Sequence, residues 1–206
     1  MHYLTFVLLD STIEVSELPK AVAAAMAPYD ENLDVLHVVA TAAEVIVNRD
    51  QVVAQHPEYA EKYTDLNVFV RDWHGHRGLD EHGNALSARN PNGKWDWYEI
   101  GGRWVGLLAV NGQGPNVARL QDIDIAHLYA DSLLLADGTW VNTDAPVPSP
   151  NGLMGLLETD PDEYETRLDE WESEKRTAWQ AKFGHILESA KQEDPEQWLV
   201  VVDRHQ

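Results

Sequence analysis

Tyr3-Leu-Thr-Phe-Val-Leu-Leu9 is the stretch of sequence that decides the fold. It is almost entirely apolar, it is far too short to cross a membrane, and it lacks the basic residues and the small-residue cleavage site of a secretory signal. These features predict a buried β-strand. A second apolar stretch, Trp198–Val202, predicts a strand near the other end of the chain. We expect the two strands to lie side by side in one sheet.

Helices and a hairpin are predicted between these strands. A Thr-x-x-Glu capping-box motif predicts a helix over 42–55, and an Asp-Pro pair predicts the start of a long, acidic, amphipathic helix over 160–190. An Asp-Gly turn between two apolar stretches predicts a β-hairpin over 132–142. The segment 70–94 is rich in Gly, Asn and His, which predicts a loop-rich insertion.

Strands near both ends of the chain, with helices and a hairpin between them, predict an α+β fold. We expect a single domain over residues 1–206, with a mostly antiparallel sheet, flanking helices and a long ordered central loop. A ferredoxin-like layout is one arrangement that would place the two terminal strands side by side.

The composition excludes several classes of function. The 206 residues include 15 Lys and Arg against 35 Asp and Glu, a formal net charge of −20, so we expect no direct binding to nucleic acid or to membranes. The absence of cysteine excludes disulfides, thiolate metal sites and cysteine nucleophiles, and it fits a cytoplasmic location. The acidity is typical of a solvated surface. The alternative is a surface that mimics nucleic acid or docks a basic partner, with its charge concentrated over 160–174.

The segment Asn90-Pro-Asn-Gly-Lys-Trp-Asp-Trp-Tyr-Glu-Ile-Gly-Gly-Arg-Trp104 carries the densest chemistry. Gly101 and Gly102 allow a tight turn whose free N–H groups would bind an anion. Arg103 offers a planar fork for phosphate or carboxylate, and Asp96 is a candidate general base. The candidate ligand-binding residues are Lys94, Trp95, Trp97, Tyr98, Gly101, Gly102, Arg103 and Trp104.

An extended backbone through this segment would place Trp95 and Trp97 on one face, as a flat stacking surface, and Tyr98 on the other. With the neighbouring cations, this arrangement suits a flat anionic small molecule such as a nucleotide. A purely structural interpretation fits the same residues. In that case the tryptophans are core residues, the glycines form a β-turn, and Arg103 pairs with Asp96.

Two further groups are candidates for chemistry. Asp203 and His205 lie two residues apart and would share one face of a continuing strand, where both are candidate catalytic residues and His205 a candidate base. The alternative is an ordinary frayed terminus. His74 and His76, which acidic residues follow, form a candidate metal site without diagnostic spacing, and the alternative is a solvated loop. The sequence indicates no particular cofactor.

The pattern N-P-x-x-K-W-D-W-Y-x-I-G-G-R-W over 90–104 resembles the hallmark of an uncharacterised protein family common in bacteriophages, prophages and bacteria. Three further stretches resemble motifs of that family, namely 27–32 (A-P-Y-D-E-N), 135–140 (L-A-D-G-T-W) and 202–205 (V-D-R-H). The resemblance implies no established reaction. In its last motif the family has Cys where this chain has Arg204, so any role of that cysteine is absent here, while the Asp and the His remain.

We therefore expect a phage- or prophage-type protein that binds or acts on an anionic, nucleotide-like small molecule through the Trp-rich motif. If it is an enzyme, we expect hydrolysis or group transfer. The alternative is a non-enzymatic acidic interaction protein that binds a host protein, such as a defence factor. A third interpretation is an accessory protein whose motif only stabilises the fold. The sequence does not decide between enzyme and binding protein.

Overall fold

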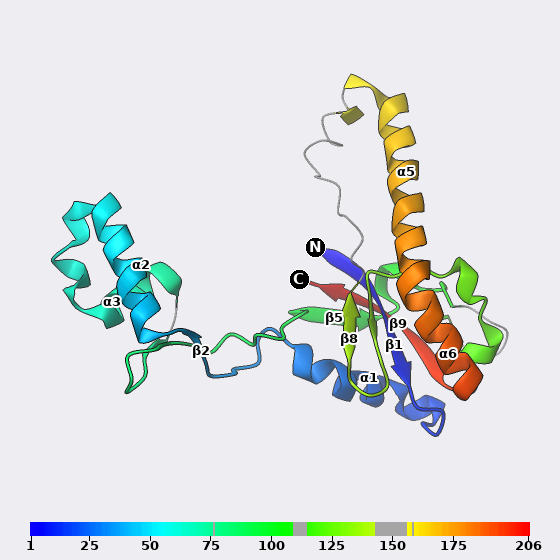
Figure 1. The fold of residues 1–206 in the computed structure, drawn as a ribbon. Helices are drawn as coiled ribbons and strands as arrows, with labels where there is room; N and C mark the ends of the chain where they lie inside the picture. The colour runs from blue at the N-terminus through cyan, green and yellow to red at the C-terminus, as the bar shows by residue number, and fades with distance from the viewer. Residues whose placement is uncertain (76, 109–114, 143–155, 158) are drawn as a thin grey trace. The chain divides into compact units, whose positions relative to one another are not determined.

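The computed structural model describes residues 1–75, 77–108, 115–142, 156–157 and 159–206. The chain divides into two compact units, each with its own sheet and its own hydrophobic core (Figure 1). The sheet unit contains residues 1–27 and 97–206, and the insert unit contains residues 28–96.

The sheet unit is built on a mixed sheet with the strand order β5-β9-β1-β7-β8 and with β6 also paired to β9. Its central strands, β1 (His2–Leu9) and β9 (Trp198–His205), are antiparallel and paired along their whole length. On the other side of β1 lies β7 (Ser132–Leu134), which is parallel to β1 and leads through a hairpin into β8 (Trp140–Asn142). The α+β fold, the hairpin and the pairing of the two terminal strands are thus confirmed.

The outer edge of β9 is covered by one interrupted strand. Its two parts are β5 (Trp97–Ile100) and β6 (Val117–Arg119). Between them, the Gly101 N–H donates to the Val201 carbonyl and the Val201 N–H donates to the Asn116 carbonyl. The chain therefore leaves this edge at Gly101 and rejoins it at Asn116.

One face of the sheet packs against α5 (Pro161–Trp179), the π-helical segment η8 (Gln180–Gly184) and α6 (His185–Glu193). The even-numbered residues of β1 point to this face, because side chains alternate along a strand. They share one core with buried side chains of the helices and of the segment that holds η6 (Leu120–Asp122) and η7 (Ile125–His127). The main members of this core are Leu4, Phe6, Leu8, Leu120, Ile125, Leu133, Trp179, Phe183, Leu187, Leu199 and Val201.

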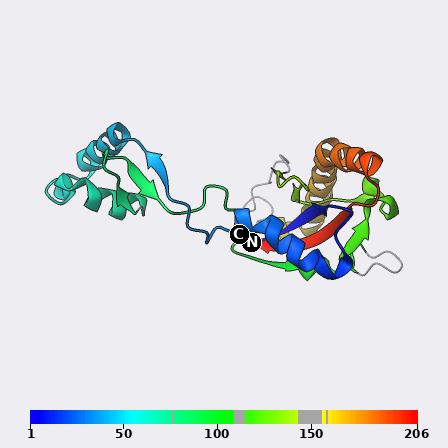
Figure 2. The same cartoon turned by 90° about the horizontal axis from the view of Figure 1, so that it is seen from below.

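The opposite face is covered by α1 (Leu18–Met26), which follows the 3-10 turn η1 (Val15–Glu17). Leu18, Val22 and Met26 recur every fourth residue and are buried, as expected of the inner face of a helix. Figure 2 shows α1, in blue, and α6, in orange, on opposite sides of β1 and β9. The terminal strands are therefore buried on both faces, which explains why the sequence of each is almost continuously apolar.

The insert unit combines a small sheet with two helices. The sheet has the order β2 (His37–Ala40), β4 (Ala85–Ser87), β3 (Gly78–Leu79), and the helices are α2 (Ala42–Gln55) and α3 (Leu66–His74). Short 3-10 turns lie at Ala27–Tyr29, Pro57–Tyr59 and Lys62–Thr64. The core consists of Val45, Tyr63, Phe69, Val70 and Ala85. No helix among the described residues of either unit is long and apolar enough to cross a membrane.

The segment 70–94 is more regular than a long loop. The strands β3 and β4 form a hairpin, and in its turn Asp80 Oδ1 accepts the N–H groups of His82 and Asn84. The Gly- and Asn-rich composition is therefore that of a hairpin turn. The parallel β1–β7 pair departs from a ferredoxin-like layout, whose neighbouring strands are antiparallel. That residues 1–206 form a single domain stays a prediction.

Replacing Thr41 with alanine is expected to destabilise the insert unit by about 1 kcal/mol, the usual cost of a lost N-cap. Thr41 accepts the Glu44 N–H at the start of α2, and the Glu44 carboxylate accepts the Thr41 N–H in return. Urea unfolding of the unsubstituted protein and of Thr41→Ala at neutral pH measures the difference in the free energy of unfolding.

The pH dependence of that difference provides a control. The hydrogen bond from the Thr41 backbone lowers the pKa of Glu44 below its ordinary value of 4.5. Its contribution is therefore present above pH 4.5 and is lost as the pH falls through the lowered pKa. Alanine keeps the backbone N–H at position 41, so the variant loses only the pH-dependent bond from the Thr41 hydroxyl to the Glu44 carboxylate. The difference between the two proteins should therefore shrink on acidification by that part, while the part due to the lost acceptor for the Glu44 N–H remains. A difference that grows on acidification would contradict the role of the capping box.

Candidate functional site

The second half of the Trp-rich motif lies on β5, at one end of the large sheet. Trp97 pairs with His205 and Tyr98 pairs with Arg204, so Trp97 and His205 share one face of the sheet and Tyr98 lies on the other. The Trp97 side chain is 48% exposed, whereas burial raises the pKa of the Tyr98 hydroxyl. Trp97 therefore presents the accessible ring of this strand.

Gly101 and Gly102 bring the next turn into close contact with β9. Their φ angles are 82° and 49°, in the region that favours glycine. A Cβ on Gly101 would lie 2.3 Å from Asn116 Nδ2, and a Cβ on Gly102 would lie 2.3 Å from the Asp203 Cβ. The two glycines thus have a steric function, because no larger residue allows the turn η5 (Gly102–Trp104) to approach Asp203.

The turn predicted to bind an anion binds a carboxylate of the chain itself. The Arg103 N–H donates to Asp203 Oδ2 at 3.1 Å, and the Gly101 N–H is taken by β9. Neither N–H group is available to an external anion. The sequence placed the glycine turn and Asp203 in two separate groups, and the fold joins them.

His2 completes this group. Asp203 is only 2% exposed, and its Oδ1 lies 2.8 Å from His2 Nδ1. An ionised carboxylate can only accept, so Nδ1 donates, and in the neutral imidazole Nε2 then carries the lone pair. The His2 ring lies opposite His205, with 5.4 Å between ring centroids, and its edge-to-face contact with Trp97 spans 6.2 Å.

Sequence reasoning missed His2 and expected Asp203 to act with His205. The antiparallel register of β1 and β9 places His2 directly opposite His205, one pleat from Asp203. A prediction of that register, which the pairing of the two terminal strands invited, would have found His2.

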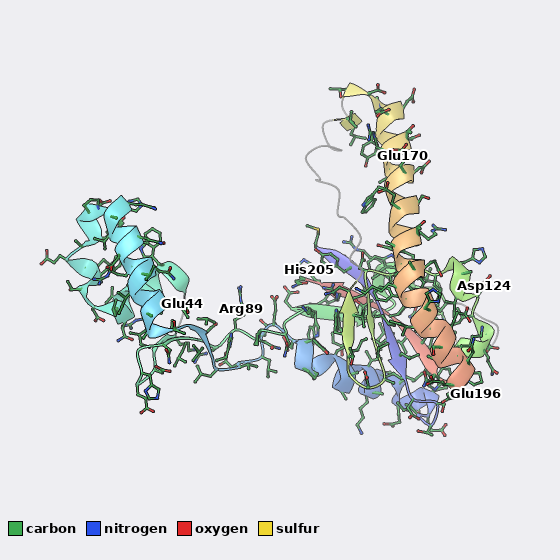
Figure 3. All side chains as sticks on the ribbon, in the orientation of Figure 1. Glu44, Arg89, Asp124, Glu170, Glu196 and His205 are labelled. Carbon is green, nitrogen blue, oxygen red and sulfur yellow. The ribbon has the colours of Figure 1, made fainter. Side chains whose placement is uncertain are left out.

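The side chains of Arg103 and Trp104 differ in their burial. Trp104 packs partly buried against the large core, which agrees with the structural interpretation for this residue. The Arg103 side chain is exposed, and no described residue forms a hydrogen bond or an ion pair with its guanidinium. We call the group formed by His2, Trp97, Arg103, Asp203 and His205 the His–Asp surface. Figure 3 labels His205 at this end of the sheet.

The first half of the motif belongs to the insert unit. The boundary between the units falls between Asp96 and Trp97, so the predicted set of Lys94, Asp96 and Arg103 is divided between them. The prediction that Trp95 and Trp97 share one face of a strand is wrong. Trp95 forms an isolated β-bridge with Asp30, and β5 begins only at Trp97.

Asn90 at the start of the motif is 4% exposed and holds the segment 27–32 in place. Its Nδ2 atom donates to the carbonyls of Pro28 and Asp30, both at 2.8 Å, and the Lys94 N–H donates to the Tyr29 carbonyl at 2.7 Å. Two stretches that the sequence analysis singled out therefore pack against each other, and this half of the motif has a structural role.

The predicted metal site and Arg204 contribute nothing to the His–Asp surface among the described residues. His76 and the side chain of His74 lie outside the described residues, and the described part of the chain contains no group of three or more potential metal ligands. Arg204 lies on the opposite face of the sheet from Asp203. Its guanidinium carbon lies 4.5 Å from the centre of the Tyr3 ring, and burial lowers its pKa.

Most of the described acidic side chains of α5 are exposed to solvent, and Figure 3 labels one of them, Glu170. The exposed ones are Asp162, Glu165, Asp169, Glu170 and Glu174. Acidic residues in the first turns also complement the helix dipole, so the charge has an ordinary structural explanation. An acidic interaction protein stays a prediction.

No protein-family model, no curated protein and no solved structure matches this chain. The resemblance to a phage and prophage family therefore stays a prediction.

Proposed function

We propose that the His–Asp surface binds an anionic, nucleotide-like small molecule and that His2 exchanges a proton with it. The observation that carries the proposal is the hydrogen bond between His2 Nδ1 and the buried carboxylate of Asp203. As part of the same proposal, the chain is a phage- or prophage-type protein whose Trp-rich motif supplies Trp97 and Arg103 to this surface.

The geometry around Asp203 supports acid–base chemistry. The carboxylate is held from one side by the Arg103 N–H, and from the other side it fixes the ring of His2. A histidine whose Nδ1 is held in this way by a buried carboxylate presents Nε2 in a fixed orientation, as a general base requires. Nε2 would accept a proton from an attacking water or hydroxyl group in a hydrolysis or transfer reaction.

Two exposed side chains support a flat, anionic ligand. Trp97 offers a ring on which a base can stack, which is worth about 1–3 kcal/mol for each base. The Arg103 guanidinium can bind a phosphate through two parallel hydrogen bonds. The Trp97 ring contacts the His2 ring, and the Arg103 backbone N–H is bonded to Asp203, so both residues belong to this surface. Glu99, which pairs with Asp203, adds an exposed carboxylate to the same face of the sheet. The proposal needs neither Lys94 nor Asp96, which lie in the other unit.

A binding screen tests the proposal. Thermal unfolding is measured with nucleoside mono-, di- and triphosphates, cyclic dinucleotides and sugar phosphates. A ligand at a hundred times its Kd stabilises the protein by about 2.7 kcal/mol, an easily measured increase in Tm. Arg103→Ala and Trp97→Ala should each weaken the binding of a ligand found in this way by at least tenfold.

Arg89→Ala is the matched control. Arg89 is an exposed residue of the insert unit (Figure 3). Its replacement removes the same charge as Arg103→Ala, but from the other unit, and should leave the affinity unchanged. If a nucleotide is turned over, His2→Gln should lower kcat about a hundredfold or more, the usual contribution of a general base. Equal loss of affinity in Arg89→Ala and Arg103→Ala, or no ligand at all in the screen, would contradict the proposal.

A further inference from the structure

A separate pocket lies near the opposite end of the same face of the large sheet. It has a volume of about 340 Å³ and is open to solvent. The residues that line it come from β1, the β7–β8 hairpin, α6 and the start of β9, and they are Leu8, Leu135, Asp137, Ile186, Ser189, Ala190, Glu193 and Gln197. Leu8 stands six residues beyond His2 on β1, which is about 20 Å along a strand. The pocket is therefore independent of the His–Asp surface.

The floor of the pocket is apolar. Leu8 is 4% exposed and belongs to the large core, and Leu135, Ile186 and Ala190 pack against that core from the hairpin and from α6. On α6, Ile186, Ala190 and Glu193 are spaced by four and three residues, so they lie on one side of the helix. A ligand that fills this floor needs a short hydrocarbon part, because the volume is at the small end of the range for ligand sites.

The rim of the pocket is negative. Glu193 and Asp137 carry carboxylates, and no lysine or arginine is among the described residues that line the pocket. Hydrogen bonds from Thr139, above all from its backbone, lower the pKa of Asp137 and keep this carboxylate ionised. Glu193 is the last residue of α6, where the helix dipole already disfavours an acid. Both carboxylates and the helix end would favour a cation here. The nearby Lys191 does not supply it, because its Nζ donates to the Ile123 carbonyl.

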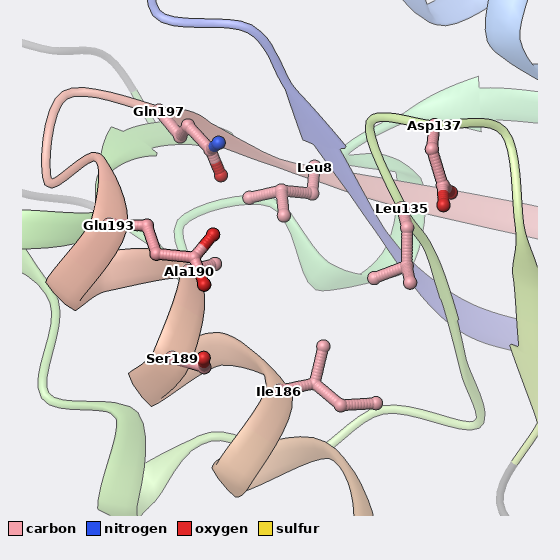
Figure 4. Close-up of a pocket in the computed structure, with 8 residues that line it drawn as sticks. All are labelled: Leu8, Leu135, Asp137, Ile186, Ser189, Ala190, Glu193 and Gln197. Atoms are coloured by element: carbon pink, nitrogen blue, oxygen red, sulfur yellow. The ribbon is translucent and has the colours of Figure 1, made fainter.

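Gln197 adds an unsatisfied acceptor. Its Oε1 atom is buried and accepts no hydrogen bond from any described residue. A buried acceptor without a donor costs about 1–3 kcal/mol. Figure 4 shows the Gln197 amide and the Glu193 carboxylate directed toward each other at one side of the pocket. The last torsion of a glutamine side chain is soft, so the oxygen can turn to meet a donor that enters the pocket.

We propose that this pocket binds an alkylammonium group: a short hydrocarbon chain on the apolar floor, with a cationic head that donates to Glu193 and Gln197. The same chemistry comes from two sources, a free aliphatic amine or the lysine side chain of a protein partner. Both place the ammonium between the carboxylates of the rim and the amide oxygen. Neither source requires the His–Asp surface.

Titrations followed by NMR of the methyl groups test the proposal. The probes are 1-pentylammonium, uncharged 1-pentanol and pentanoate, and the reporters are the methyl groups of Leu8, Leu135 and Ile186. We expect pentylammonium to bind at least tenfold more tightly than pentanol and pentanoate not to bind. Tighter binding of Nα-acetyl-lysine-N-methylamide than of pentylammonium would identify a protein lysine as the source, and the reverse order would identify a free amine.

Variants of α6 locate the effect. Ala190→Phe fills the pocket and should abolish binding, and Glu193→Gln should weaken it about fivefold to tenfold. Glu188→Gln removes the same charge from an exposed position elsewhere on α6 and should leave the affinity within twofold. Because Glu193 is exposed, its variant keeps the test valid even if the phenylalanine disturbs the fold. Equal affinities for pentylammonium and pentanol, or equal effects of the two glutamine variants, would overturn the proposal.

Discussion

Replacing Gly102 with alanine is expected to lower the free energy of unfolding of the sheet unit by about 2–5 kcal/mol. Two costs add. A residue with a Cβ at a φ of 49° loses about 1–2 kcal/mol to backbone strain. The new Cβ would also lie 2.3 Å from the Asp203 Cβ and 2.5 Å from its Oδ2, so the turn or the carboxylate must move, at about 1–3 kcal/mol. Urea unfolding followed by circular dichroism measures the total.

Gly106→Ala separates the two costs. Gly106 also has a positive φ, 91°, but a Cβ there would meet no atom of the described residues within 4 Å. This variant should lose only the strain of about 1–2 kcal/mol. In Gly102→Ala, moreover, the NMR signals of the His2 ring should shift, because the hydrogen bond to Asp203 is displaced. Equal destabilisation in both variants, with unchanged His2 ring signals, would show that the close approach to Asp203 is unimportant.

The features that local sequence determines could be predicted. The capping box of α2, the Asp160 cap of α5 and the Asp-Gly hairpin turn each depend on residues a few positions apart, and the structure has all three. The terminal strands were also recognisable, because burial on both faces requires continuously apolar sequences. The second of these strands was predicted to end at Val202, whereas β9 continues through three polar residues to His205.

The features that depend on tertiary register could not be predicted in the same way. His2 and Asp203 are 201 positions apart in sequence, and no local pattern marks the second residue of a chain as the partner of a buried carboxylate. The glycine pair had the signature of an anion-binding turn, but the Gly101 N–H binds the Val201 carbonyl, and the N–H that binds a carboxylate, that of Asp203, belongs to Arg103. An extended backbone was expected to place Trp95 and Trp97 on one face, but backbone hydrogen bonds to Tyr29 hold Lys94 and Trp95 in the other unit.

The second large effect is expected at Trp179. Trp179→Ala should destabilise the sheet unit by about 3–5 kcal/mol, the usual cost of removing a fully buried tryptophan. The side chain is 0% exposed at the end of α5, and its ring contacts those of Phe6 and Phe183 at centroid distances of 6.1 and 5.7 Å. It links the last turn of the acidic helix to the central strand β1. Thermal and urea unfolding measure the loss.

Two variants test whether packing alone explains this effect. The Trp179 indole N–H is buried without a partner among the described residues, so Trp179→Phe removes an unsatisfied donor along with part of the ring. We therefore expect a cost below about 1.5 kcal/mol, much less than for alanine. Trp171→Ala, earlier on the same helix and only partly buried, should cost about 1 kcal/mol or less. A phenylalanine variant as unstable as the alanine variant would mean that the indole nitrogen has a partner, such as a buried water, and that α5 is held to the sheet by a polar contact as well as by packing.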